Sequence, residues 1–364
     1  MGDRIIFHID FDYFYAQCEE IRNPELKARP VCVCVYSDRG GGSGAIATAN
    51  YTAREYGVKS GMSISAAKTK LNEKKDAVFL PVDFEYYIDI SENAMEIMKN
   101  KSDIFEYVGK DEAYLDVSKK VDFDWEKAKK LAIEIKEEIK EKLKLTCSIG
   151  ISPNKLISKI GSDFQKPDGL TIVKPNQVDE FLESMKIREI PGIGNKTEEK
   201  FSEMNLSTIK ELKDLDVFTL NKLFGRKVGT YIYNSVRGID NEPVKTREPN
   251  SQFSKIMTMK IDSLEFDFIL KNLKELCKEV HQIVLKKNQM FKSIGIHLIQ
   301  SDLSNKTKSK TIKNPTSSLE ELERNVEQLL KEALLDQKLP VRRVGVKVSD
   351  LSDLREQSNL TNYF

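Results

Sequence analysis

Two acidic groups, separated by a long stretch of chain, constrain this protein more than any other feature of its sequence. Asp10 ends a short apolar segment, and Asp111 and Glu112 lie at the bend between two apolar segments, 104–108 and 113–117. Segments of this kind predict buried strands, and two of them joined by a polar bend predict a hairpin. The strands would bring several carboxylates to one place. Taken singly, each acidic group could equally be an ordinary surface turn.

Convergent carboxylates are what a pair of Mg²⁺ ions requires. Each ion keeps octahedral oxygen coordination and carries a substrate phosphate, so several carboxylate oxygens must arrive from different strands. The pattern therefore indicates a two-metal site for phosphoryl transfer.

Three longer motifs surround these acids, over residues 10–17 (DFDYFYAQ), 43–54 (SGAIATANYTAR) and 111–116 (DEAYLD). In this order they resemble the catalytic motifs of the Y-family translesion DNA polymerases, and most of all the archaeal DinB-type members. The resemblance continues to the end of the chain. Several long motifs at matching spacing are far more specific than any one of them.

The resemblance implies an α+β fold with a polymerase palm, fingers, a helical thumb that contains a helix-hairpin-helix, and a separate α+β little-finger domain. The implied boundaries are 1–13 and 80–170 for the palm, 14–79 for the fingers, 171–237 for the thumb, 238–250 for a linker, 251–350 for the little finger and 351–364 for a clamp-binding tail. The order of strands and helices also predicts a palm sheet with helices on one face.

Apolar periodicity predicts the individual elements. In the first half we expect helices over 13–22, 52–56, 84–101 and 125–144, and strands over 31–35, 45–49 and 146–152. In the last third we expect strands over 255–259, 293–299 and 343–348, with helices near 265–286 and 318–335.

Composition narrows the class of protein. A chain of 364 residues suits two to four modest domains. We find no apolar run long enough to span a bilayer and no signal peptide at the N-terminus, so we expect a cytoplasmic protein without a membrane partner. Five scattered cysteines form neither a disulfide framework nor a zinc signature, and Cys32 and Cys34, which alternate with valines, are predicted to be buried strand thiols.

The net charge of +1 argues against a nucleic-acid partner, but its distribution does not. Residues 245–313 carry 14 lysines and arginines against 7 acidic residues, a local charge of +7, whereas 320–336 is mainly acidic. A basic face backed by an acidic helix can bind phosphates and remain soluble. A solvated surface would also explain such charge runs.

The resemblance assigns roles in the catalytic site. Asp10, Asp111 and Glu112, with the main-chain carbonyl of Phe11, match the ligands of two Mg²⁺ ions. One ion would lower the pKa of the primer 3′-hydroxyl, and the other would hold the triphosphate and the leaving pyrophosphate. Asp12 and Asp116 have no metal role in the family, and we expect them to form structural hydrogen bonds.

The incoming deoxyribonucleoside triphosphate has its own set of matching residues. Tyr51, Arg54 and Lys166 match contacts to the triphosphate, which suits a phenol donor, a bidentate guanidinium and an ammonium group. Tyr15 matches the steric gate that excludes a ribose 2′-hydroxyl, although taken alone it would pass for a core aromatic. Ala47, with Gly44 and Ala45, matches the small residues above the nascent base pair, and Thr48 also falls among the substrate-binding residues.

Two further segments match surfaces for macromolecular partners. Gly192, Gly194 and Lys196 belong to the turn 190–196, which matches a helix-hairpin-helix, where main-chain N–H groups meet a DNA phosphate. Residues 223–229 form a much weaker second copy. We also expect Arg342 and Arg343 to bind primer-template DNA.

The last eight residues match the sliding-clamp-binding peptide, Gln-x-x-Leu-x-x-Tyr-Phe. Gln357 would form a hydrogen bond, and Leu360, Tyr363 and Phe364 would form one apolar plug, because i, i+3 and i+4 share a helical face. A frayed terminus is the ordinary alternative.

The chain departs from the family at two places. Gly109 and Lys110 precede the acidic pair, where relatives usually carry Ser-Ile. The lysine could pair with a catalytic carboxylate or reach a DNA phosphate, and the glycine would loosen the hairpin. Asp83 and Phe84 stand where close relatives are basic, so one contact to the duplex is expected to be missing.

The combined prediction is a monomeric DNA-templated DNA polymerase that carries out low-fidelity translesion synthesis by two-metal-ion nucleotidyl transfer, without a proofreading exonuclease. One rival is another palm enzyme such as a nucleotidyl cyclase, which has no use for the helix-hairpin-helix or the clamp peptide. The other is a non-catalytic primer-template-binding scaffold, against which the intact Asp10, Asp111 and Glu112 count.

Overall fold

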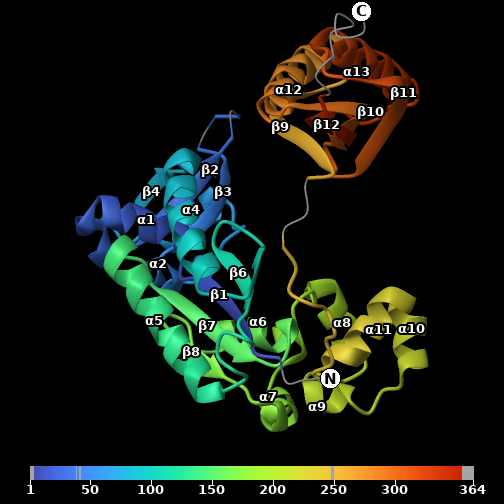
Figure 1. Ribbon diagram of the computed structural model, residues 1–364. Coiled ribbons are helices and arrows are strands. Elements are labelled where there is room, and N and C mark those ends of the chain that lie inside the picture. Colours follow the sequence, from blue (N-terminus) through green and yellow to red (C-terminus); the bar gives the residue numbers. More distant parts are fainter. Residues whose placement is uncertain (1–3, 38, 41, 247–249, 355–364) are drawn as a thin grey trace, which may run out of the picture. The chain divides into compact units, whose positions relative to one another are not determined.

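A computed structural model describes residues 4–37, 39–40, 42–246 and 250–354 (Figure 1). The chain divides into two compact units, one built mainly from residues before 247 and the other mainly from residues after it. Each unit is described by itself.

The first unit is organised around a five-stranded sheet in the order β5-β6-β1-β7-β8. Its strands are β5 (Ile104–Tyr107), β6 (Glu112–Asp116), β1 (Ile6–Phe11), β7 (Cys147–Ser152) and β8 (Leu170–Ile172). The predicted hairpin is confirmed, because β5 and β6 pair in antiparallel register. The central strand β1 is antiparallel to both β6 and β7, so its carboxyl end lies beside the start of β6.

Helices cover both faces of this sheet. Helices α4 (Phe84–Asn100) and α5 (Trp125–Leu143) pack their apolar sides on Phe7, Ile9 and Phe11 of β1. Helix α6 (Lys155–Phe164) packs on the opposite face, against β1 and β7. The prediction of helices on one face only was therefore wrong. Glycine explains the difference: a Cβ on Gly150 of β7 would lie 1.9 Å from the carbonyl oxygen of Ser158, so only glycine lets α6 approach so closely.

An inserted segment lies between β1 and α4. It contains α1 (Phe14–Arg22), α2 (Tyr51–Glu55) and α3 (Ile64–Lys70), with a three-stranded sheet in the order β3-β2-β4. Strands β2 (Val31–Tyr36) and β3 (Gly44–Ala49) were predicted, but β4 (Val78–Pro81) and α3 were not. Because β4 pairs with β2, it belongs to the sheet of the insertion and crosses the expected boundary at 79/80.

The rest of the first unit is helical, as predicted. It contains α7 (Val178–Glu183), α8 (Asn195–Glu203), α9 (Ile209–Leu212), α10 (Val217–Phe224) and α11 (Arg226–Ser235). Their apolar side chains share one core with Leu156, Ile157 and Ile160 of α6. The expected linker begins as a packed segment, because Val244 is buried against Ile6 and Tyr114.

The second unit is a four-stranded antiparallel sheet in the order β11-β10-β12-β9, with α12 (Phe266–Lys286) and α13 (Leu319–Leu334) on one face. The strands are β9 (Gln252–Ser263), β10 (Gln289–Gln300), β11 (Asn305–Thr316) and β12 (Val341–Asp353). Both predicted helices are confirmed. Strand β12 continues to Asp353, so its last residues belong to the sheet although the tail was expected from residue 351.

The cysteine prediction is confirmed, since Cys18, Cys32, Cys34, Cys147 and Cys277 are all buried free thiols. The helices formed by the described residues include none with the length and apolar character to cross a membrane.

Candidate polymerase active site

The three expected metal-binding acids lie at one end of the palm sheet. Asp10 pairs with Glu112 across β1 and β6, and the main-chain N–H of Phe11 donates to the carbonyl of Asp111 at 2.8 Å. The backbone therefore brings residues 10, 11, 111 and 112 together, as the strand endings predicted.

Two of these acids form ion pairs with lysines. Asp10 accepts from Lys166, which also contacts Asp163 at 2.8 Å, and Glu112 accepts from Lys159. Among the described residues no three histidine, cysteine or acidic side chains are grouped closely enough to hold a metal ion. Asp10 and Glu112 are each paired with a lysine here, and the role of the three acids as metal ligands stays a prediction.

The three acids differ in electrostatic state. Burial raises the pKa of Asp10 to about 6, against the opposing effect of Lys166, and burial also raises the pKa of Asp111. A hydrogen bond with His8 contributes most to lowering the pKa of Glu112 to about 2, and Lys159 adds to this effect. Glu112 is therefore held ionised, whereas burial opposes ionisation of Asp10 and Asp111. A cation bound among the three would stabilise the ionised form of all of them.

His8 and Lys159 are site residues that the sequence reasoning missed. His8 is fully buried, with Nε2 at 3.1 Å from Glu112 and Nδ1 at 2.7 Å from the hydroxyl of Ser162. Since the Glu112 carboxylate can only accept, Nε2 carries the hydrogen and donates to it. The Ser162 hydroxyl beside Nδ1 also lies 2.8 Å from the carbonyl of Lys159, to which it donates. Burial lowers the pKa of His8 to about 4, so its imidazole is neutral at pH 7. The available signal was the position of His8, two residues before Asp10 and on the same strand face.

The remaining acids of the motifs have structural roles, as expected. Asp12 is fully buried and accepts from the hydroxyls of Thr146 and Ser148 and from the N–H of Asp168, each at 2.8 Å. Asp116 accepts from the hydroxyl of Ser118 at 2.6 Å. Both carboxylates have hydrogen-bond partners that leave them little freedom to bind a metal ion.

Two of the expected triphosphate residues, Tyr51 and Arg54, lie on α2, whereas Lys166 follows α6. The guanidinium of Arg54 lies 4.9 Å from the ring centroid of Tyr51 and donates to the carbonyl of Ala49 at 2.8 Å. The Tyr51 hydroxyl is buried and has no hydrogen-bond partner in the described part of the chain. A buried hydroxyl of this kind is a donor available to an anion. Ala47 and Thr48 precede this group on β3 and are partly exposed.

The expected steric gate belongs to an aromatic layer. Tyr15 stacks on Tyr87 with ring centroids 4.6 Å apart and 16° between the planes. Phe84 meets Tyr15 edge-on at 6.1 Å. Tyr15 is only partly buried, so its ring has one supported face and a part that remains open to a ligand.

The two departures from the family have local explanations. Asp83 caps α4 through the N–H of Tyr86 and forms an ion pair with Arg22 at 2.8 Å. Gly109 does not have a positive φ. A Cβ at this residue would lie 3.3 Å from Oδ1 of Asp111, so the glycine leaves room for that carboxylate. The ammonium of Lys110 lies over the ring of Phe84, and its pairing with a carboxylate is not seen among the described residues.

The expected helix-hairpin-helix turn is formed. Gly192 has φ of +85°, a conformation that favours glycine, and Gly194 caps the N-terminus of α8, which begins at Asn195 beside Lys196. The weaker second copy is also a turn between helices, since Gly225, with φ of +81°, joins α10 to α11.

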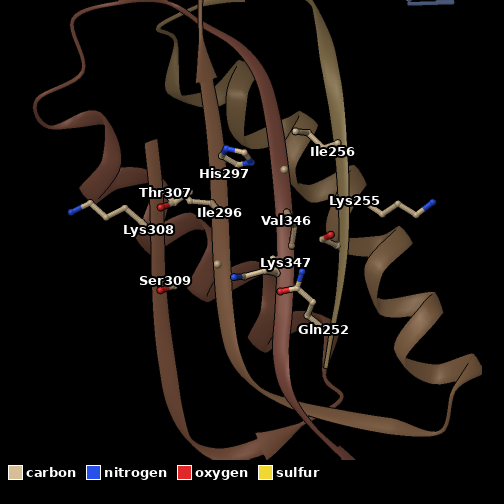
Figure 2. Close-up of a pocket in the computed structure, with 13 residues that line it drawn as sticks. Gln252, Lys255, Ile256, Ile296, His297, Thr307, Lys308, Ser309, Val346 and Lys347 are labelled. Carbon is tan, nitrogen blue, oxygen red and sulfur yellow. The ribbon is translucent and has the colours of Figure 1, made fainter. Parts of the chain in front are cut away.

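The open face of the second unit carries small polar residues and a few cations. This face holds a hollow of about 330 Å³. His297, Thr307 and Lys347 are among the residues that line it, and they are labelled in Figure 2. Lys347 extends over Gly295, whose added Cβ would lie 3.6 Å from the lysine Cε. Arg343 shares this face by strand alternation, whereas Arg342 contacts Asp262 at 3.9 Å. Not all of the local basic charge is on this face, because Lys306 forms an ion pair with Asp336.

The predicted clamp-binding residues, Gln357, Leu360, Tyr363 and Phe364, lie outside the described residues.

Comparison with known proteins gives three family matches, which follow one another along the chain in the order expected for palm and fingers, thumb and little finger. Residues 9–163 match the impB/mucB/samB family, residues 250–360 match the C-terminal domain of that family, and residues 188–240 match the thumb domain of DNA polymerase-iota.

Two relatives match over their full length. DNA polymerase IV of Nitrosopumilus maritimus (strain SCM1) is 69% identical and DNA polymerase IV of Methanosarcina acetivorans is 41% identical, each with 100% of both chains covered.

Solved structures agree with these matches. A Y-family DNA polymerase chimera, Dbh-Dpo4(243-245)-Dbh, gives a TM-score of 0.88 at 35% identity, covering 96% of this chain and 99% of the other. An insertion ternary complex of Dbh DNA polymerase gives 0.70 at 35% identity, with the same coverage.

Proposed function

The chain belongs to the Y family of DNA polymerases, of the DNA polymerase IV type, and from this we propose that it copies damaged templates with two Mg²⁺ ions held at Asp10, Asp111 and Glu112. The observation that carries the proposal is the pairing of Asp10 with Glu112 across β1 and β6, with Asp111 bonded to Phe11 through the main chain. Carboxylate and carbonyl oxygens are the donors that Mg²⁺ prefers, so this set fits the ion. When bound, Mg²⁺ supplies charge neutralisation and activation of the primer hydroxyl.

The side chains of the site divide the remaining work. His8 and Lys159 hold Glu112 ionised, and the buried hydroxyl of Tyr51 is a donor for the triphosphate. Lys166 forms an ion pair with Asp10 in the structure. When a metal ion binds Asp10, the Lys166 ammonium is free to bind a phosphate of the nucleotide. The ring of Tyr15 excludes the 2′-hydroxyl of a ribonucleotide.

We expect Asp10→Ala, Asp111→Ala and Glu112→Ala each to abolish nucleotide addition while primer-template affinity stays within a few fold, because these acids hold metal and not DNA. Single-nucleotide extension and DNA binding by anisotropy measure the two effects. Glu96→Ala, which removes an exposed acid on α4, should change neither. Full residual extension in any of the three site variants would contradict the metal assignment.

Synthesis is proposed to proceed on primer-template DNA with deoxyribonucleoside triphosphates, by a cytoplasmic monomer without proofreading. The solved relatives described as ternary complexes support the choice of substrates. A primer with a 3′ mismatch, incubated with Mg²⁺ and no nucleotide, tests for proofreading. Shortening of that primer would contradict the proposal.

The tail is proposed to bind the sliding clamp through Gln357, Leu360, Tyr363 and Phe364. Tyr363→Ala with Phe364→Ala should leave basal extension intact and weaken clamp binding by on the order of a hundredfold or more, since two rings are lost and burying each aromatic side chain is worth about 2 kcal/mol. Calorimetric titration against the clamp measures the loss. Asn359→Ala with Thr361→Ala, at the unspecified positions of the motif, is the control. Equal affinities of wild type and aromatic variant would show that the motif is accidental.

A further inference from the structure

The two places where the sequence departs from its family meet in the structure. Lys110, which precedes the acidic pair, has its ammonium 4.6 Å from the ring centroid of Phe84, at the first turn of α4. Phe84 is 43% exposed, so its ring depends on few contacts. A cation above an aromatic ring attracts it electrostatically and keeps it in place.

Phe84 in turn contacts the ring of Tyr15. The edge-on geometry, with centroids 6.1 Å apart and 80° between planes, is a favourable one for two aromatic rings. On its other side Tyr15 stacks on Tyr87, which is fully buried and donates its hydroxyl to Glu19 at 2.7 Å. Tyr87 is therefore a fixed support, and Phe84 is the neighbour of Tyr15 whose position can vary.

The main chain of Lys110 is also anchored to α4. The buried Ser91 donates its hydroxyl to the carbonyl of Lys110 at 2.5 Å. Asp111, the next residue, belongs to the proposed metal site, so the same short segment connects the catalytic carboxylates with the aromatic layer under Tyr15. A shift of this segment would therefore move both the catalytic carboxylates and the aromatic rings beside Tyr15.

We propose that Phe84 and Lys110 are positioning residues for sugar selection, which hold the Tyr15 ring against the sugar of the incoming nucleotide. The inference rests on the proposed role of Tyr15 as steric gate. Loss of either residue lets the Tyr15 ring move away from the sugar, which admits a 2′-hydroxyl without removing the surface on which a deoxyribose lies.

The test compares kcat/KM for dCTP and CTP opposite a template guanine, in wild type, Phe84→Ala and Lys110→Met. Methionine keeps the length of the side chain and removes its charge. Both variants should lower the dCTP preference by about five- to tenfold, mainly through faster CTP addition, since one aromatic or cation–π contact is lost. Phe84→Tyr and Lys110→Arg, which preserve the contacts, should stay close to wild type.

The control is Phe123→Ala, which removes another half-exposed phenylalanine, 50% exposed, from the same unit. It should leave the dCTP preference unchanged. Thermal unfolding of every variant shows that it is folded before rates are compared.

Tyr15→Ala and the double variant Tyr15→Ala with Phe84→Ala separate this inference from the function on which it rests. The double variant should equal Tyr15→Ala, because Phe84 acts only through Tyr15. An unchanged dCTP preference in Tyr15→Ala would refute the gate itself. A changed preference in Tyr15→Ala, with wild-type preference or an equal loss for both sugars in Phe84→Ala and Lys110→Met, would refute the role of Phe84 and Lys110 alone.

Discussion

Asp10 and Glu112 are opposite each other in the sheet, yet their surroundings act on their pKa values in opposite directions. Burial raises the pKa of Asp10 to about 6, while the hydrogen bond with His8 and the charge of Lys159 lower that of Glu112 to about 2. Glu112 is thus ionised and able to bind a cation at neutral pH. Ionisation of Asp10 costs more free energy, and a cation bound beside it would lower that cost. At this scale, charge balance and not shape defines the site.

His8 should lower the free energy of unfolding as pH falls from 6.5 to 4. Its pKa in the folded protein is about 4, below the ordinary 6.5, so the unfolded chain takes up a proton first as pH falls from 6.5 to 4 and stability is lost. Asp10, raised from 3.8 to about 6, acts in the opposite direction over nearly the same range. In the metal-free protein the two effects largely offset each other.

His8→Gln removes only the first of these effects. We expect the variant to be less stable than wild type at pH 7, and the difference to shrink by up to about 3 kcal/mol between pH 7 and pH 4. Urea unfolding in EDTA at several pH values measures it. A difference that is constant with pH would show that His8 is not held neutral by burial.

At the scale of elements, the position of α6 decides where the missed residues lie. Lys159 and Ser162 reach Glu112 and His8 because α6 packs directly on β1 and β7. The close approach depends on Gly150, opposite which the main chain of α6 leaves no room for a side chain. The packing of α6 on β1 and β7 therefore places Lys159 and Ser162 beside Glu112 and His8.

Gly150→Ala should be destabilising out of proportion to one methyl group. The added Cβ would lie 1.9 Å from Ser158 O and 2.5 Å from Ser162 N, so α6 must move, and overpacking of this kind costs about 3 kcal/mol. We also expect slower nucleotide addition, because Lys159 moves with the helix. Thermal unfolding and single-nucleotide kinetics measure the two effects.

Gly194→Ala is the matched comparison for stability. Apart from its chain neighbours, no atom of the described residues lies within 4 Å of a Cβ at that residue, and its φ of −96° is open to any residue. A small loss, of roughly 1 kcal/mol or less, is expected from a changed helix cap. Equal losses in both variants would remove the packing argument.

At the scale of the whole molecule, the near-neutral net charge of +1 conceals a local basic surface. On the open face of the second unit, Lys347 lies across Gly295 and Arg343 has a buried Nε without a hydrogen-bond partner in the described chain. Two other cations of the unit are already paired with acids, Lys255 with Glu279 and Lys306 with Asp336. Arg343 and Lys347, which form no ion pair with another described residue, are therefore the cations that we expect to meet DNA phosphates.

Neutralising two of these cations should reduce the salt dependence of DNA binding. Arg343→Gln with Lys347→Gln should lower the slope of log K against log salt by about 2, because each lost phosphate contact releases about one counterion fewer. Lys271→Gln with Lys278→Gln removes the same charge from the exposed side of α12 and should change the slope far less. Equal slopes for the two double variants would locate the DNA surface elsewhere.

Much of the fold followed from the sequence alone, for a local reason. Helices α4, α5, α12 and α13 have the apolar period of their type, and strands β1, β5, β6 and β7 are short apolar segments, both of which are set by neighbours within a few residues. Strand β8 was not predicted. The placement of Asp10, Asp111 and Glu112 was predictable in the same way, because residues that end paired strands meet at one edge of a sheet. Short or weakly patterned elements, such as α3 and β4, were missed because tertiary pairing and not local pattern stabilises them.

Only the tertiary structure decided which side chains act on these acids. His8 lies 104 residues before Glu112 in the chain and Lys159 lies 47 residues after it, so no local pattern connects them. The same holds for Lys110, which the sequence allowed to pair with a carboxylate or a phosphate, and which instead lies over Phe84. A sequence states which charges and rings a chain possesses, whereas their partners depend on which distant segments pack together, because hydrogen bonds, ion pairs and ring contacts form only between groups that lie close together.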